Sequence, residues 1–175
     1  MAHRAWAFLA WAGAMAIGTP ALAAEPERVC TAPGALSTDL LDWAMLGFRD
    51  AAATPQALAT ARLASREAVH GHLQPADAVR LVHTPEKPAA PGTFSGMWQI
   101  AVAKPGTWRV VLGTRAWIDM IGPDGQPVAS VAHDMGPACT GIRKIVDFPL
   151  QVGNYTIQIV GSAGADATIM VIPKS

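Results

Sequence analysis

The chain has 175 residues, of which 13 are basic and 13 are acidic, so its formal net charge at pH 7 is zero. This balance argues against nucleic acid or an anionic membrane surface as a partner, because both favour basic patches. The length suits one domain with a hydrophobic core of its own.

Residues 1–23 have the form of a secretory signal peptide. Arg4 supplies a positive charge, an apolar run follows at 6–17, and the Ala-Leu-Ala at 21–23 has the small-x-small pattern of a cleavage site. The apolar run is too short for a transmembrane helix, which needs about 20 residues. No later segment is long and apolar enough. We therefore predict a secreted or periplasmic protein with no membrane span in the mature chain.

The two cysteines, Cys30 and Cys139, both follow the predicted cleavage site. An even number of cysteines in an oxidising compartment indicates a disulfide bond, and two cysteines allow one pairing within a chain. Closing so long a loop could stabilise the fold by up to about 4–5 kcal/mol if the entropy of the unfolded chain dominates. We expect the bridge to tie an irregular N-terminal segment to the body of the domain.

Residues 24–74 are expected to form a helical segment that packs on the body of the domain. Apolar residues recur at helical spacing over Thr38–Phe48 and predict a short helix. Thr54 and Pro55 suit the N-cap and the first position of a second helix, which would end near Val69.

Residues 75–175 change to a β pattern, in which short alternating runs are separated by turn signals such as Pro105-Gly106. Several strands without intervening helices predict a mainly β fold, either an antiparallel β-sandwich or a jelly-roll-like domain. The Pro-rich stretch Glu86–Gly92 is expected to be a stiff connection. The expected strands are Ala78–Thr84, Gly96–Ala103, Thr107–Leu112, Trp117–Ile121, Gln126–Ala132, Ile142–Leu150, Asn154–Val160 and Ala167–Ile172.

Two turn-and-strand segments share one pattern. Pro105–Thr114 (PGTWRVVLGT) and Val152–Ser162 (VGNYTIQIVGS) each place an aromatic residue shortly after a glycine and then alternate aliphatic residues. This pattern resembles the hairpins of the bacterial pre-peptidase C-terminal type of β-sandwich. The resemblance implies a secreted accessory module associated with folding, secretion or ligand contact.

A longer stretch, HDMGPACTGIRKIVDFPL at 133–150, is followed by GNYTIQIVGS at 153–162. Together they resemble a group of short secreted proteobacterial proteins of unsettled function. Some members are described as homogentisate 1,2-dioxygenases, which would imply an oxygenase. Dioxygenases of that name are much longer cupin proteins that hold iron with two histidines and a carboxylate. No residues of this sequence can be matched to those ligands, so an oxygenase activity follows from the resemblance alone.

Four histidines follow the predicted signal peptide: His70, His72, His83 and His133. On an extended backbone, residues i and i+2 project to the same side, so His70 and His72 could bind one Cu or Zn ion. A third ligand would come from His83, His133 or Asp134. The alternative is a polar linker that happens to contain two histidines. We expect no cofactor. If the protein does bind a metal, these residues would suit Cu or Zn.

Trp117 shares its predicted strand face with Asp119, and a partly exposed indole beside a carboxylate could stack on a sugar ring or an aromatic ligand. Three nearby polar residues, His133, Asp134 and Arg143, are further candidates for ligand binding, and Arg143 could form an anion site. The alternatives are structural: packing at the rim of a sheet for Trp117, a turn at Asp134, and an ion pair for Arg143.

Lys144 occupies an unusual position for a charged residue. In the predicted strand it shares a face with Val146 and Phe148, which suit a core. The lysine must therefore either extend its ammonium group to solvent or meet a partner such as Asp119 or Asp134.

The sequence contains no complete catalytic set. A Cys139 nucleophile would need a free thiolate, which the predicted disulfide opposes, and no G-x-S-x-G motif supports a serine hydrolase. We therefore predict a non-catalytic accessory or binding module whose partner is a small ligand or a periplasmic or extracellular protein. Metal binding through the four histidines is one alternative, and the oxygenase activity is another.

Overall fold

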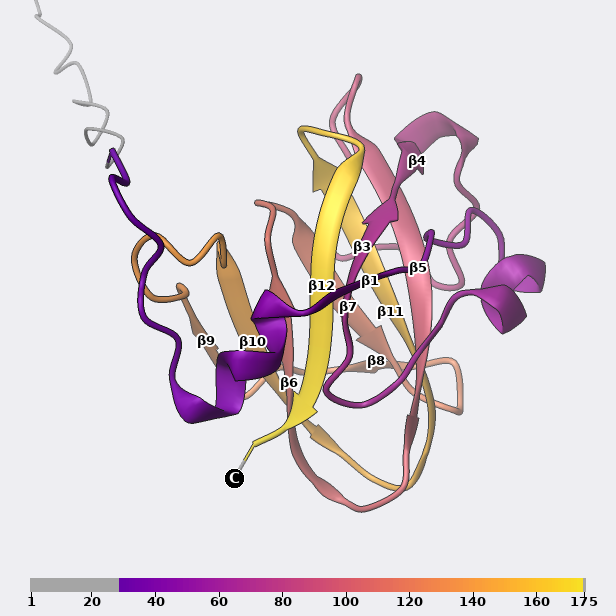
Figure 1. Cartoon of the computed structure of the whole chain (residues 1–175). Helices are drawn as coiled ribbons and strands as arrows, with labels where there is room; N and C mark the ends of the chain where they lie inside the picture. Colours follow the sequence, from indigo (N-terminus) through magenta and orange to yellow (C-terminus); the bar gives the residue numbers. More distant parts are fainter. Residues whose placement is uncertain (1–28, 175) are drawn as a thin grey trace, which may run out of the picture.

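A computed structural model describes residues 29–174, and the predicted signal peptide at 1–23 lies outside the described residues. Two β-sheets pack face to face, and the polypeptide crosses repeatedly from one sheet to the other (Figure 1). Three short 3-10 helices, η1 (Thr38–Ala44), η2 (Pro55–Thr60) and η3 (Ala76–Ala78), lie among the first strands of the described chain.

The strand order defines the two sheets, which we call sheet A and sheet B. In spatial order, sheet A contains β1 (Leu46–Phe48), β3 (Ala68–His72), β12 (Asp166–Pro173), β6 (Gly106–Leu112), β10 (Lys144–Leu150) and β9 (Ala132–Asp134). Sheet B contains β2 (Arg62–Leu63), β5 (Phe94–Val102), β11 (Gly153–Ser162), β7 (Trp117–Ile121) and β8 (Pro127–Val128), with β4 (Gln74–Pro75) also paired to β5.

The predicted fold class is confirmed: the protein is mainly β and forms a β-sandwich. Most neighbouring strands are antiparallel, as expected, but β1 pairs with β3 and β2 pairs with β5 in parallel. Both parallel pairs lie at the edge of a sheet, where the N-terminal segment contributes the short strands β1 and β2.

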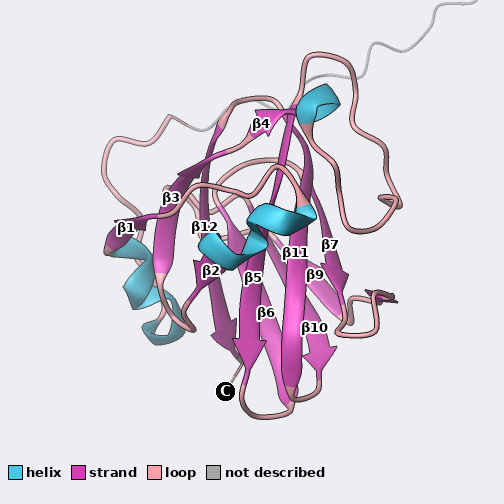
Figure 2. Cartoon of the chain, turned by 90° about the vertical axis from the view of Figure 1, so that its right-hand side faces the viewer, coloured by secondary structure: helices cyan, strands magenta, loops and turns pink. Residues whose placement is uncertain are grey.

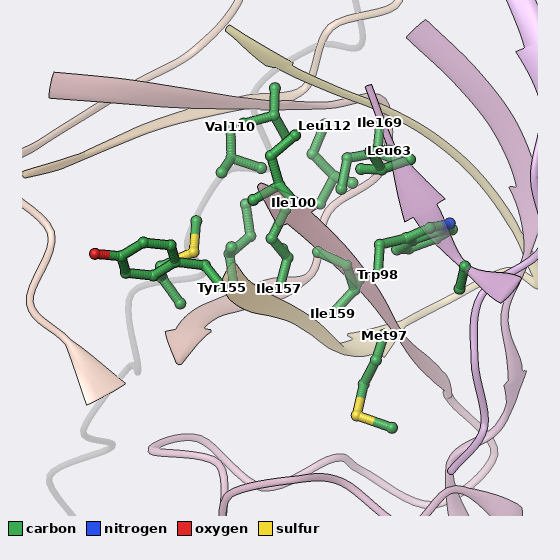
Figure 3. Packing of buried hydrophobic residues seen from close by; sticks show 14 of the residues in the cluster. Leu63, Met97, Trp98, Ile100, Val110, Leu112, Tyr155, Ile157, Ile159 and Ile169 are labelled. Atoms are coloured by element: carbon green, nitrogen blue, oxygen red, sulfur yellow. The ribbon is translucent and has the colours of Figure 1, made fainter. Parts of the chain in front are cut away.

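The core between the sheets explains the sequence pattern that the two hairpins share. Trp108, Val110 and Leu112 project from β6, while Tyr155, Ile157 and Ile159 project from β11, and all six are buried in one cluster. Figure 3 shows side chains of both strands meeting in this layer. Each fully buried aliphatic side chain of this kind contributes about 1.5–3 kcal/mol relative to exposure. Alternation of apolar residues therefore corresponds to a buried inner face on each strand.

The helices predicted for the N-terminal segment are present only in part, as short 3-10 helices. The Thr38–Phe48 helix is reduced to η1 and is followed by β1, while the helix expected from Thr54 to Val69 is reduced to η2 and is followed by β2 and β3. Leu63 and Val69 are buried in the core, and this burial outweighs the helix preference of an Ala- and Leu-rich segment. The sandwich therefore begins well before residue 75.

Two predicted strands in the later part of the chain also need correction. Ala78–Thr84 is not a strand, because this segment crosses over sheet B, where the His83 backbone bonds to a side chain of β11. The expected strand Gln126–Ala132 shrinks to β8, and the polar residues His133 and Asp134 belong to the edge strand β9. The other expected strands are confirmed within a few residues, and Glu86–Gly92 contains no strand, as expected.

The outer face of sheet A is covered by the N-terminal segment, and Figure 1 shows η1 lying against this sheet. Trp43 of η1 is buried there, and its indole N–H donates a hydrogen bond to the carbonyl of Thr140 at 3.0 Å. The predicted disulfide is confirmed: Cys30 and Cys139 are bonded, with their Cα atoms 5.5 Å apart. The buried apolar side chains on this face are Leu40, Trp43, Ala68, Val111, Ile142, Ile145, Met170 and Ile172.

The outer face of sheet B is covered differently. Figure 2 shows η2 lying across the strands of this sheet, and Leu58 of η2 is buried there. The connection between η3 and β5 lies nearby, since the backbone of His83 bonds to the side chain of Gln158 on β11. Within residues 29–174, no helix is long and apolar enough to cross a membrane.

Candidate functional site

A pocket with several cationic side chains opens at the rim of the sandwich, where β7 and β10 begin. Its volume is about 410 Å³. Its lining residues come from both sheets, from the connection before β7 and from the Pro-rich connection before β5. They are Lys87, Pro88, Ala90, Arg115, Ala116, Trp117, Lys144, Val160 and Gly161.

Lys144 is the best-defined charged group of this pocket. Alternation along β10 places it on the inner side with Val146 and Phe148, and its register partner on β6 is the core residue Leu112. At the rim its ammonium group donates a hydrogen bond to the carbonyl of Ala116 at 3.1 Å. The same nitrogen lies 5.1 Å from the centre of the Trp117 ring, which is a cation–π contact.

Burial and repulsion both act on the Lys144 ammonium group. Burial lowers the pKa of Lys144, the charge of Lys87 lowers it further, and the charge of Asp119 raises it by a smaller amount. Among the ion pairs of residues 29–174, none involves Lys87, Arg115 or Lys144. The pocket therefore concentrates positive charge without a carboxylate in contact with it.

Trp117 is held in place by the carboxylate of Asp119. The indole N–H donates a hydrogen bond to Oδ1 of Asp119 at 2.7 Å, and both side chains project from the outer face of β7. Asp119 is only 7% exposed, and its Oδ2 has no hydrogen-bond partner among the described atoms. Burial is the main reason that the pKa of Asp119 is raised, while the bond from Trp117 opposes the shift.

The connection that covers this part of sheet B is fixed by Gln158 of β11, whose register partner on β7 is Asp119. The side-chain oxygen of Gln158 accepts a hydrogen bond from the backbone N–H of His83 at 2.9 Å, and its amide nitrogen donates to the carbonyl of His83 at 3.1 Å. Gln158 is fully buried, and this pair of bonds anchors the chain shortly before Lys87 and Pro88 reach the pocket.

A second and larger hollow carries less chemistry. It has a volume of about 530 Å³ and lies between η3 and the residues that precede β5. Asp77 is the only ionisable side chain in its lining, and the rest are Pro, Ala, Gly, Thr and Phe residues. The smaller pocket combines three cations with an indole, so it has the stronger basis for specific binding.

The candidate binding residues from the sequence do not form one site. Trp117 lines the pocket, whereas Arg143 is exposed, is not part of the lining and uses its backbone N–H to bond the carbonyl of Leu112. His133 and Asp134 lie exposed on β9 at the edge of sheet A, and the Asp134 carboxylate accepts a hydrogen bond from the N–H of the next residue. Asp134 therefore ends an edge strand and does not lie in a turn.

The sequence predicts that Lys144 extends to solvent or meets a partner such as Asp119 or Asp134. Its ammonium group instead contacts the carbonyl of Ala116 and the ring of Trp117, and Asp119 acts on it only through its charge. Sequence reasoning missed Lys87 and Arg115. Both lie in connections without regular periodicity, so no spacing signal relates them to Trp117.

The four histidines do not converge. His133 lies on β9, and β12, β6 and β10 separate that strand from β3, which carries His70 and His72. With about 4.8 Å between neighbouring strands, this separation is roughly 19 Å. His83 lies over sheet B instead. As the side chains stand, no group of three or more His, Cys, Asp or Glu within residues 29–174 could hold a metal ion.

His70 and His72 do project to the same side of β3, as predicted. Both contact Oδ1 of Asp166, which belongs to the neighbouring strand β12: Nδ1 of His72 at 2.9 Å and Nε2 of His70 at 3.5 Å. Asp166 and His72 are register partners across the strands. The sequence pattern of alternating histidines identified two members of this cluster but not the aspartate.

The comparisons with known proteins add no family to these observations: no protein-family model matches the chain, and no curated protein sequence is significantly similar to it. The resemblance to the pre-peptidase C-terminal hairpins and to the short secreted proteobacterial proteins therefore stays a prediction. The disulfide is compatible with a periplasmic or extracellular location.

Proposed function

We propose that this protein is a secreted or periplasmic, non-catalytic binding module that takes a small anionic ligand in the pocket of Lys87, Arg115, Trp117 and Lys144. The observation that carries the proposal is the half-buried ammonium group of Lys144, which lies over an indole, near another lysine, with no carboxylate in contact. A bound anion would offset the repulsion between Lys144 and Lys87.

The chemistry of the pocket favours a ligand that is both anionic and planar or apolar. A carboxylate or similar group of the ligand would accept hydrogen bonds from the cationic side chains. Each such charged hydrogen bond contributes about 1.5–3 kcal/mol. The ring of Trp117 and the apolar atoms of Pro88, Ala90 and Val160 offer surface to the rest of the ligand. An aromatic carboxylate combines both properties.

A titration with benzoate tests this proposal, with benzamide as the uncharged compound of similar shape. We expect saturable binding of benzoate that shifts the indole N–H resonance of Trp117 in the NMR spectrum, and weaker binding of benzamide. Lys144→Met should weaken benzoate binding by about tenfold or more, because it removes one charged hydrogen bond. Arg143→Ala is the matched control, because this neighbouring cation is exposed and outside the pocket, and it should leave binding unchanged.

Equal binding of benzoate and benzamide, or equal effects of the two substitutions, would contradict an anion site at Lys144. The non-catalytic part of the proposal has a separate test. The purified protein should consume no oxygen with iron and homogentisate, and oxygen uptake under these conditions would support the oxygenase alternative instead.

A further inference from the structure

The exposed end of β3 and β12 carries a cluster that the anion pocket does not involve. It contains His70 and His72, which occupy alternate positions of β3, and Asp166, which lies opposite His72 on β12. Phe48 of β1 is the register partner of His70, and their rings meet edge to face with centroids 5.7 Å apart. Three side chains with metal-ligating atoms therefore share one face of two adjacent strands, β3 and β12.

We propose that His70, His72 and Asp166 form a binding site for a divalent transition-metal ion of the Zn²⁺ class, and that the ion replaces the present contacts between the imidazoles and the carboxylate. Two imidazole nitrogens and one carboxylate oxygen are ordinary ligands of Zn²⁺, and three protein ligands leave a fourth position for water. This set differs from the four histidines considered from the sequence, because Asp166 takes the place of His83 and His133.

The present distances are close to those that a bound ion needs. Tetrahedral coordination at 2.0–2.1 Å places neighbouring ligand atoms roughly 3.3 Å apart, and Oδ1 of Asp166 lies 2.9 Å from His72 Nδ1 and 3.5 Å from His70 Nε2. The present side-chain conformations do not yet form a group that could hold an ion, and the centroids of the two imidazole rings are 6.4 Å apart. Rotation of side chains about fixed Cα positions is the change that metal binding requires.

Burial permits this rotation in two of the three ligands and restrains the third. The side chains of His72 and Asp166 are 61% and 64% exposed, so no packed neighbour opposes a new rotamer, whereas His70 is 35% exposed and contacts Phe48. The backbone beneath is held on both sides, because β3 pairs with β1 and with β12, and the N–H of His72 also donates a hydrogen bond to the Asp50 carboxylate at 3.2 Å. A side chain at Gly71, on the inner face, would collide with the carbonyl of Arg49.

Isothermal titration of the disulfide-bonded protein with Zn²⁺ tests the site, with any polyhistidine tag removed. We expect one ion per chain and an increase in the melting temperature when Zn²⁺ is added. His72→Ala and Asp166→Asn should each weaken binding by about tenfold or more, since even the loss of a group that only orients a ligand costs 10–100-fold. His133→Ala is the matched control, because this histidine is also exposed but lies on the edge strand β9, and the substitution should have no effect.

The imidazole resonances of His70 and His72 should shift together as Zn²⁺ is added, while that of His83 stays in place. Absence of Zn²⁺ binding, binding that survives both His72→Ala and Asp166→Asn, or an equal loss in His133→Ala would overturn the proposal. Lys144→Met should leave Zn²⁺ binding intact, so failure of the anion pocket and failure of this metal site give different results.

Discussion

Two regions of the sandwich differ in whether their buried charges form ion pairs. On the outer face of sheet A, Asp147 is only 3% exposed, and it contacts Arg109 at 2.9 Å and Lys174 at 2.8 Å. Arg109 also pairs with Asp39 of η1 at 2.9 Å. At the rim of the sandwich, Lys144 of sheet A and Asp119 of sheet B are withdrawn from solvent, and neither forms an ion pair within residues 29–174. The paired charges attach η1 to sheet A, whereas Lys144 at the rim has no ion-pair partner in the described part of the chain.

The segments that cover the outer faces of the two sheets also differ in how they are attached. η1 is fixed on sheet A by the ion pairs of Asp39 and Asp42, by the Trp43 indole and by the disulfide that begins the described chain. Near Lys87, the connection over sheet B relies on the two hydrogen bonds between Gln158 and His83. The first cover is thus held by ion pairs and a covalent bond, whereas the connection near Lys87 is held by hydrogen bonds.

The largest effect is expected from removing the disulfide. Replacing Cys30 and Cys139 by serine should lower the free energy of unfolding by about 4 kcal/mol, because the bridge closes a loop of 109 residues. Urea denaturation measures this loss. Hydrogen exchange at the Trp43 indole should become faster. Exchange at the amide of His83 should become faster only by as much as global unfolding does. A change of less than about 1 kcal/mol would mean that η1 is held by its other contacts.

Asp147→Asn is expected to cost about 3 kcal/mol, because it leaves Arg109 and Lys174 beside a neutral, buried group. Asp134→Asn is the matched control: its carboxylate is exposed and bonds only a neighbouring N–H, so it should cost under about 0.5 kcal/mol. Thermal or urea unfolding compares the two variants, and similar small losses would contradict a structural role for the Arg109–Asp147 pair.

The same pair predicts an acid dependence of stability. Burial alone would raise the pKa of Asp147, but hydrogen bonds from Arg109 and Lys174 outweigh it and lower the pKa below the ordinary 3.8. The carboxylate therefore contributes stability that is present above pH 3.8 and lost as the pH falls through the folded-state pKa. Asp147→Asn should lack this part of the acid dependence, which unfolding curves measured between neutral pH and about pH 2 can detect.

Lys144→Met should leave the free energy of unfolding within about 1 kcal/mol of the wild-type value, or raise it, because it removes a half-buried charge without an ion-pair partner. The lowered pKa of Lys144 means that its charge opposes folding below the folded-state pKa, and that this cost disappears as the pH rises towards 10.5. The difference between variant and wild type should therefore narrow in alkali. A loss of several kcal/mol would assign Lys144 to the fold.

The smallest effect is expected from Asp119→Asn, which keeps an oxygen for the Trp117 indole but removes the negative charge near Lys144. Benzoate should bind about threefold more tightly, in keeping with the modest energy of a partly screened charge pair. The raised pKa of Asp119 gives stability that is present below pH 3.8 and lost as the pH rises through the folded-state pKa, so the variant should be slightly more stable at neutral pH. Weaker benzoate binding would contradict this assignment.

Local patterns in the sequence were sufficient to predict the main strands, the disulfide and the strand face on which Lys144 lies. Alternation with period two depends on neighbouring residues alone, so it places Trp117 with Asp119 and Lys144 with Val146 before any partner strand is known. The cysteine count leaves one intramolecular pairing. The same reasoning correctly predicted that His70 and His72 share a side.

Only the tertiary structure decided which of these faces meet. The segment before residue 75 became edge strands because burial of Leu63 and Val69 outweighs local helix preference. Lys87 and Arg115 lie in irregular connections, where no periodic pattern in the sequence indicates that they line the pocket. Asp166 reached His72 through strand pairing between residues distant in sequence. Sequence patterns determine the direction of each side chain along its own strand, whereas neighbours across strands follow from which hydrogen-bonded pairing buries the most apolar surface.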